Sequence, residues 1–176
     1  MNLLHNRAAA GQAATAEVSR AAAPDRLERL RQAVDEILPR QPDPDQRRCG
    51  YVHLYGVSAA CVLLALRRGL EVELCAAAGM LHDIWSYQVG PNPEHASLGL
   101  PEAERILTMA GFSPAEVETI CAAIRRHSDK ASVHGELDEL LKDADVLQHY
   151  LYNPALQPPW RQYPRLAQVF DELGLK

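Results

Sequence analysis

The sequence predicts an all-α protein. Apolar residues recur at helical spacing in one segment after another, and no segment shows the polar and apolar alternation of a strand. Helix-start signals that contain proline and helix-stop signals that contain glycine separate these segments. No internal repeat at a fixed period is present. We therefore expect helices joined by loops, and no sheet.

Composition narrows the class of protein. The chain has 176 residues, of which 47% are hydrophobic, and this suits one globular domain with a sizeable core. The formal net charge is −5 without a basic patch, so nucleic acid is not an expected partner. No uninterrupted apolar run approaches the length of a membrane span, so no membrane is expected. The four cysteines form no CxxC pair, which favours reduced thiols and a cytoplasmic protein.

The N-terminal part divides at a helix-start signal. Residues 1–24 are alanine-rich and weakly patterned, and we expect a poorly ordered or marginally helical extension there. Residues 25–176 are expected to form a single helical domain. Its first helix follows Pro24-Asp25 and runs to about Leu38, where a group of prolines ends it. The segment 40–50 is rich in proline and charge and is predicted to be a loop.

Two apolar helices come next. The first covers residues 53–68 and is followed by Gly69, a residue typical of the helix C-cap. The second covers residues 70–83 and is apolar at nearly every position in its centre, which indicates a buried helix. Residues 84–93 contain glycine and prolines and are predicted to be a loop.

Capping signals define the remaining helices. A helix is predicted over residues 94–110, and Pro101 either kinks it or splits off a first part of about one turn. The segment Ser113-Pro114-Ala115-Glu116 combines an N-cap serine, a proline at the first helical position and the glutamate of a capping box. It starts a helix that runs to about His127. After a polar loop, the last two predicted helices cover residues 136–152 and about 161–173.

Polar residues that bind metals well lie at the ends of the apolar helices. Four of the seven histidines are at predicted helix ends: His53, His82, His95 and His127. His82 is followed directly by Asp83, so a buried helix ends in an imidazole and a carboxylate. Burying a charged group is costly unless it is paired or bound to a metal. A divalent cation would satisfy both side chains, although a simple polar helix end also explains the dipeptide taken alone.

Two aspartates lie within the predicted helix 136–152. Asp143 and Asp145 are about 200° apart around a helix, so only one of them is expected to face the interior. Asp145 follows the apolar Leu141 by one turn, which places Asp145 on or beside the buried stripe. We therefore expect Asp145 to be the aspartate that faces the core.

These residues form a recognisable pattern. In order along the chain, His53, the pair His82-Asp83 and Asp145 resemble the H…HD…D signature of the HD-domain superfamily of metal-dependent phosphohydrolases. The segment 142–147 resembles the final aspartate helix of that family, and the resemblance extends over residues 53–153. It implies an HD-domain-like bundle of about five core helices plus flanking helices.

The resemblance also implies a cofactor. His53, His82, Asp83 and Asp145 would bind a divalent metal, and two imidazoles with two carboxylates suit Mn, Fe, Mg, Co or Zn. No thiolate takes part, which argues against a structural zinc site. One ion is expected, and two are permitted. The metal would activate water to attack phosphorus.

Further residues are candidates by the same resemblance. His95 and His127 resemble two extra histidines that bind a second metal in some branches of the family and face the substrate phosphate or donate protons in others; a capping role is the remaining alternative. The candidate catalytic residues are therefore Asp83, His95 and His127. Lys130 and Arg126 are candidates for contacts with phosphate oxygens, the alternative being solvated surface charge.

Other histidines and aromatic residues receive structural predictions. His134 and His149 are expected at the surface, although His149 follows the aspartate by one turn and a place near the metal is its alternative. Trp85, Tyr87 and Tyr55 are expected to pack in the core or at the rim of a pocket, with stacking on a base as the alternative.

The implied function is cleavage of a phosphoester or phosphoanhydride in a small phosphorylated molecule, with nucleotides among the candidates. Two alternatives stay open. The six histidine and aspartate candidates would permit a di-iron oxidative enzyme of the same fold, and the module could instead bind a ligand without catalysis, stabilised by metal. A homodimer is compatible with the sequence. No motif names the substrate, because pocket residues in loops follow no readable code.

Overall fold

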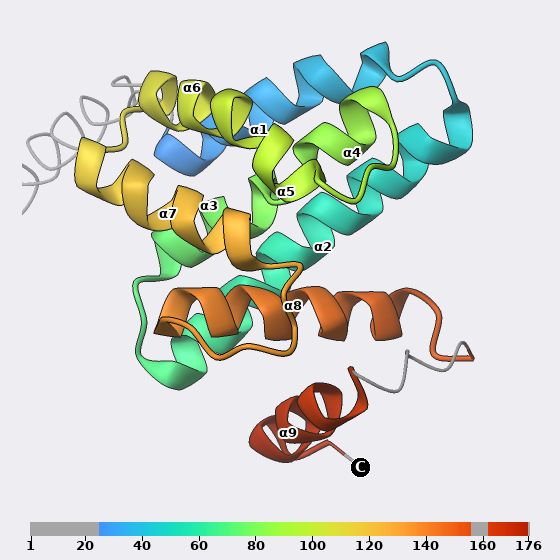
Figure 1. Cartoon of the computed structure of the whole chain (residues 1–176), viewed down its shortest axis with the longest axis vertical. Coiled ribbons are helices and arrows are strands. Elements are labelled where there is room, and N and C mark those ends of the chain that lie inside the picture. The colour runs from blue at the N-terminus through green and yellow to red at the C-terminus, as the bar shows by residue number, and fades with distance from the viewer. Residues whose placement is uncertain (1–24, 156–161, 176) are drawn as a thin grey trace, which may run out of the picture.

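The structure is a computed structural model that describes residues 25–155 and 162–175 (Figure 1). Within these residues every regular element is a helix, so the all-α prediction is confirmed. The expected extension, residues 1–24, lies outside the described residues, and the division into an extension and one domain stays a prediction. The helices are α1 (Arg26–Ile37), η1 (Leu38–Arg40), α2 (Pro44–Arg68), α3 (Val72–Leu81), α4 (Ile84–Val89), α5 (His95–Leu98), α6 (Leu100–Ala110), α7 (Pro114–Arg126), α8 (Glu136–Tyr152) and α9 (Tyr163–Leu173).

The centre of the bundle is formed by α2, α3 and α8. α2 packs against both of the others, and α3 is buried from Cys75 to Leu81. α1 and α7 pack on α3, α6 lies against both of them, and α9 packs on α8 (Figure 1). This arrangement brings the end of α3 against the middle of both α2 and α8. The residues that follow α3 are therefore held deep in the molecule.

A glycine allows the close approach of α2 and α3. A Cβ atom added to Gly79 would lie 2.8 Å from Ser58 Cα and 2.9 Å from Cys61 Sγ, distances that require the helices to separate. The Ser58 hydroxyl donates a hydrogen bond to the Ala76 carbonyl across the same contact, at 2.9 Å. The lack of a side chain at Gly79 thus sets how close His82 and Asp83, which follow α3, lie to α2.

Two predicted loops are wrong. α2 begins at Pro44, because the Asp43 side chain accepts hydrogen bonds from the backbone N–H groups of Asp45 and Gln46 and Pro44 occupies the first turn. Proline therefore starts a helix where we expected it to maintain a loop. Residues 84–89 form the short helix α4, which ends at Gly90 with a positive φ of 126°.

Capping predictions are confirmed elsewhere. The region predicted as one helix with Pro101 inside is divided into α5 and α6, with Pro101 in the first turn of α6. At the start of α7 both halves of the capping box are formed, because Ser113 Oγ accepts from the Glu116 backbone and the Glu116 carboxylate accepts from the Ser113 N–H at 2.7 Å.

The helix α2 is long and apolar. By length and composition it could cross a membrane, with a mean hydropathy of 1.7 over its most apolar window. Half of that window is buried inside the bundle, and a core helix passes the same test. The hydropathy of α2 therefore follows from its place at the centre of the fold.

A fully buried lysine anchors the loop before α8. Lys142 Nζ donates to the Ser132 carbonyl at 2.8 Å and to Glu139 Oε1 at 2.8 Å, and it lies 2.7 Å from His134 Nδ1. Burial raises the pKa of the Glu139 carboxyl, but Lys142, the His134 backbone N–H and Arg165 outweigh burial and lower this pKa to about 2.

The Gly79→Ala variant should be destabilised by about 1–3 kcal/mol, because the added methyl group forces α2 and α3 apart. Urea denaturation followed by circular dichroism measures this change. An unchanged denaturation midpoint would show that the two helices separate without loss of packing.

The pKa of Glu139 predicts an acid-dependent loss of stability. Because its pKa is lower in the folded state than the ordinary 4.5, the ionised carboxylate stabilises the fold above pH 4.5, and this contribution disappears as the pH falls toward 2. The Glu139→Gln variant should therefore lose less stability than the wild type over this interval. Urea midpoints at several pH values test the difference; equal slopes for both proteins would refute it.

Candidate metal centre

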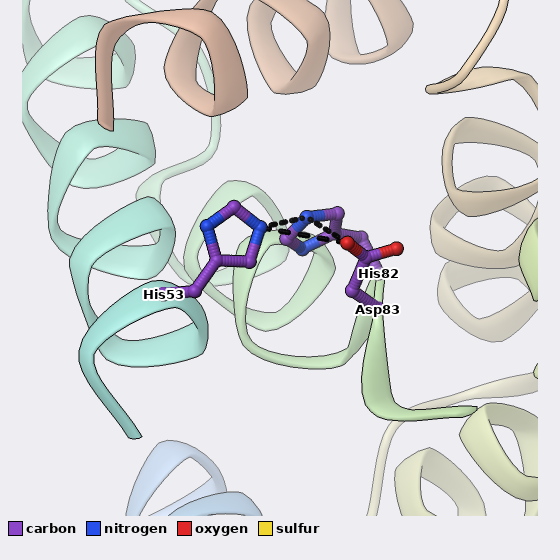
Figure 2. A group of neighbouring side chains, drawn as sticks. All are labelled: His53, His82 and Asp83. Carbon is purple, nitrogen blue, oxygen red and sulfur yellow. Dashed lines mark hydrogen bonds and ion pairs between the residues drawn. The ribbon is translucent and has the colours of Figure 1, made fainter. Parts of the chain in front are cut away.

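Four side chains singled out in the sequence meet at one place. His53 extends from the middle of α2 toward His82 and Asp83, which link the end of α3 to α4 (Figure 2). His53 Nε2 lies 3.1 Å from His82 Nε2, 3.5 Å from Asp83 Oδ2 and 3.4 Å from Asp145 Oδ1. These are the separations expected between ligands that each lie about 2 Å from one ion. We call these four residues the primary cluster.

A second group adjoins the first through Asp83. The other carboxylate oxygen of Asp83, Oδ1, lies 3.1 Å from His95 Nε2 and 3.3 Å from His127 Nε2. The two imidazole nitrogens are 3.2 Å apart. We call Asp83, His95 and His127 the secondary cluster. Each cluster contains three or more groups suited to holding a metal ion, and Asp83 belongs to both.

The imidazoles are all oriented in the same way. Each of the four histidines has its Nδ1 within hydrogen-bond distance of an oxygen acceptor, which assigns the proton to Nδ1 and directs Nε2 to the clusters. The acceptors are Gln148 Oε1 for His53 at 2.7 Å, the Gly79 carbonyl for His82 at 2.9 Å, the Asn92 carbonyl for His95 at 2.7 Å and the Ile124 carbonyl for His127 at 2.7 Å.

This orientation leaves pairs of nitrogen atoms face to face. His53 and His82 Nε2 are 3.1 Å apart, and His95 and His127 Nε2 are 3.2 Å apart. Two nitrogens that both present lone pairs repel each other, and a divalent cation would relieve this repulsion by accepting both lone pairs at once. In the second pair the Ser128 hydroxyl also lies near both nitrogens, at 3.1 Å from His95 Nε2 and 3.2 Å from His127 Nε2.

Two buried carboxylate oxygens support the same interpretation. Asp83 Oδ1 and Asp145 Oδ1 are shielded from solvent and accept no hydrogen bond within the described residues. A buried polar atom without a partner costs roughly 1–3 kcal/mol, and more when it is charged. Both oxygens point at imidazole nitrogens. Metal coordination would satisfy them, so the residues present fit a divalent ion.

The electrostatics keep the carboxylates ionised. Burial raises the pKa of Asp83, but the neighbouring imidazoles, His82 first, outweigh burial and lower this pKa well below its usual range. The pKa of Asp145 is likewise lowered despite burial, chiefly by Lys130. Burial alone lowers the pKa of His53, yet Asp83 and Asp145 reverse the effect and raise it. Ionised carboxylates are the form that binds a cation.

Lys130 and Arg126 occupy different surroundings. Lys130 Nζ donates to Asp145 Oδ2 at 2.6 Å, so this lysine adjoins the primary cluster. Arg126 pairs instead with Asp138 on the first turn of α8, at 3.3 Å. Lys130 is itself held by α9, because Arg165 donates to the Lys130 carbonyl at 3.2 Å.

The two aspartates of α8 are both buried, which corrects the expectation that only one faces the interior. Asp143 faces a different neighbour from Asp145. Its oxygens accept from Arg68 at 2.7 Å and from Arg165 at 2.6 Å. Charged partners from α2 and α9 therefore cover Asp143, whereas Asp145 points at the imidazoles.

His149 and His134 also have defined neighbours. His149 is exposed over 60% of its side chain, as expected, yet its Nε2 lies 3.3 Å from Asp145 Oδ1. His134 is half-buried beside Lys142. Among the aromatic residues, Tyr87 lies 5.8 Å from the His53 ring, between centroids, and Tyr55 donates to Asp35 at 2.6 Å.

One residue of the site escaped the sequence analysis. Gln148 accepts from His53 Nδ1 and donates to the Val52 carbonyl at 3.3 Å, so it fixes the orientation of the His53 ring. A Cβ atom added to Gly56 would lie 2.8 Å from Gln148 Cγ, so glycine is needed there. The available signal was spacing, because Gln148 follows Asp145 by three residues and shares its helix face.

Comparisons with known proteins agree with this geometry. The family described as "HD domain" matches residues 50–150, more than half of the chain and all of both clusters. The chain belongs to the HD domain family. A protein of Bacillus subtilis (strain 168) named "Putative phosphohydrolase YueE" is 29% identical over 117 residues, which cover 57% of this chain and 66% of the relative. This chain thus spans a little less than two thirds of that relative. No solved structure matches.

The clusters predict that a divalent metal stabilises the fold. At a free metal concentration of 100 times the dissociation constant, the free energy of unfolding should rise by about 2.7 kcal/mol per site. The Asp83→Ala variant, which removes a group from both clusters, should show little of this gain. Thermal or urea denaturation with metal and with chelator measures it. Equal metal-dependent gains in both proteins would contradict the assignment.

Proposed function

We propose that this chain is a metal-dependent phosphohydrolase that cleaves a phosphoester or phosphoanhydride of a small molecule, with nucleotides among the candidate substrates. The observation that carries the proposal is the position of the Asp83 carboxylate between two pairs of imidazoles. Its Oδ2 faces His53 and His82, and its Oδ1 faces His95 and His127. Membership of the HD domain family and the printed name of the Bacillus relative support it. The free cysteines Cys49, Cys61, Cys75 and Cys121 support a cytoplasmic location.

The proposal gives each residue a role. His53, His82, Asp83 and Asp145 would hold one ion, and Asp83, His95 and His127 a second. A bound divalent ion lowers the pKa of water and polarises a phosphoryl oxygen. Gln148 and the carbonyls of Gly79, Asn92 and Ile124 keep the imidazoles aimed at the ions.

Lys130 supplies a positive charge beside the site. Its ammonium group contacts the Asp145 carboxylate in the structure. If Asp145 held a cation, its attraction for Lys130 would be weaker, and the ammonium group would be available to a substrate phosphate. Arg126 is proposed for the same contact only if it leaves Asp138, its partner in the structure.

A second candidate function keeps the same residues. Four of the six histidine and aspartate candidates pair with Asp83, and this bridging arrangement of nitrogen and oxygen ligands also suits two irons. A di-iron oxidative enzyme would contain iron with a mixed-valence signal and would not turn over phosphoesters. A binding module without catalysis would show metal-dependent stability and neither activity.

The Asp83→Ala variant tests the proposal most directly. Protein purified without chelator should contain divalent metal and hydrolyse a generic phosphoester, and the variant should lose both while keeping its helical circular dichroism. The His95→Ala variant should lose one metal per chain and keep the other, because His95 belongs to the secondary cluster and not to the primary one. Elemental analysis and phosphate release are the measurements.

Asp171→Ala is the matched control, because Asp171 is an exposed carboxylate on α9 away from both clusters. It should keep the metal content and activity of the wild type. Wild-type metal content in Asp83→Ala would refute the proposed ligands. Metal without hydrolysis of any phosphoester would refute the phosphohydrolase, and an iron signal would then favour the oxidative alternative.

A further inference from the structure

A small apolar pocket adjoins the primary cluster. It lies between α2, α4 and α8, has a volume of about 160 Å³ and is walled by Cys49 and Val52 from α2, Tyr87 from α4 and Tyr152 from α8. His53, Gln148 and His149 complete its lining. We call it the tyrosine pocket. The roles proposed for the two clusters make no use of this pocket.

The tyrosine pocket is adjacent to the candidate metal ligands. His53 lines the pocket and places Nε2 in the primary cluster, and its ring lies 5.8 Å from that of Tyr87. The His149 ring lies 4.7 Å from the His53 ring and reaches Asp145 Oδ1 at 3.3 Å. The pocket and the primary cluster therefore share the His53 side chain, and a short group bonded to a phosphate at the cluster would lie beside the pocket.

The lining of the pocket is largely aromatic. Two tyrosine rings and two imidazole rings line a space that is well below the roughly 300–1,000 Å³ typical of pockets for larger ligands. The Gln148 amide in the lining is already engaged at both ends, by His53 and by the Val52 carbonyl. Sugar hydroxyls entering the pocket would lose water and find few partners besides the tyrosine hydroxyls and His149, which is unfavourable.

We propose that the tyrosine pocket binds an aromatic ring joined to the phosphate directly or through one carbon, so that the substrate is an aryl or arylmethyl phosphomonoester. This inference rests on the proposed phosphohydrolase function. A nucleotide presents ribose next to its phosphate, and ribose hydroxyls match the pocket poorly. The proposal thus favours an aromatic substrate over nucleotides and sugar phosphates.

Benzyl phosphate and glycerol phosphate test the proposal, because both release a primary alcohol and differ in the group that would enter the pocket. The wild type should prefer benzyl phosphate by about tenfold or more in kcat/KM. Val52→Trp, which fills the pocket from a side chain that is 41% exposed, should bring the ratio close to one. Tyr152→Ala, which removes a wall that is 53% exposed, should lower the ratio as well.

Leu63→Trp is the matched control. Leu63 is 49% exposed on the same helix and does not line the pocket, so this variant should keep the wild-type ratio. Metal content and denaturation midpoints of all variants establish that each is folded and loaded. A wild type without preference for benzyl phosphate, or a Val52→Trp variant that keeps the preference, would overturn the inference.

A binding measurement separates this inference from the proposed function. Calorimetry with the non-hydrolysable benzylphosphonate and methylphosphonate should show tighter binding of the benzyl compound to metal-loaded wild type and Leu63→Trp, and no such difference for Val52→Trp. If this pattern appears while no ester is hydrolysed, the pocket assignment stands and the phosphohydrolase fails. If both phosphonates bind equally to the wild type, the pocket assignment fails.

Discussion

The carboxylate of Asp83 imposes the constraint on which the rest of the site depends. Its two oxygens face different pairs of imidazole nitrogens, and the nitrogens within each pair are 3.1 Å or 3.2 Å apart. Positive charge between nitrogen atoms at that distance is favourable, and a buried carboxylate favours the same charge. Negative and electron-rich groups are thus concentrated in the interior, where a cation would relieve the repulsion. Packing of the surrounding helices must therefore offset the unfavourable free energy of burying these groups together.

Helix ends and helix packing deliver these groups. His82 and Asp83 follow the buried helix α3, so the chain turns inside the molecule rather than at its surface. Gly79 brings α3 close enough to α2 for the rings of His82 and His53 to meet, and its carbonyl also accepts from His82. One glycine therefore sets both the spacing of two helices and the orientation of an imidazole.

The sequence predicted the structural features that depend on residues close together in the chain. The capping box at Ser113 and the break at Pro101 act within a few residues, and both were predicted and are formed. The first turns of α2 were missed because Pro44 favours a helix start only together with the Asp43 cap. The burial of Asp143 and the tyrosine pocket depend on contacts between distant helices, which no single segment records.

The contact between Arg165 and the Lys130 carbonyl connects the last helix to the site. Arg165 also binds Asp143 and Glu139, so one side chain of α9 fastens α8 and the loop before it together. A chain that ended before α9 would retain every proposed metal ligand but lose this fastening. The C-terminal helix α9 therefore holds the loop that carries Lys130 in position. Removing α9 would change the affinity of the site for an anion while leaving the proposed metal ligands in the chain.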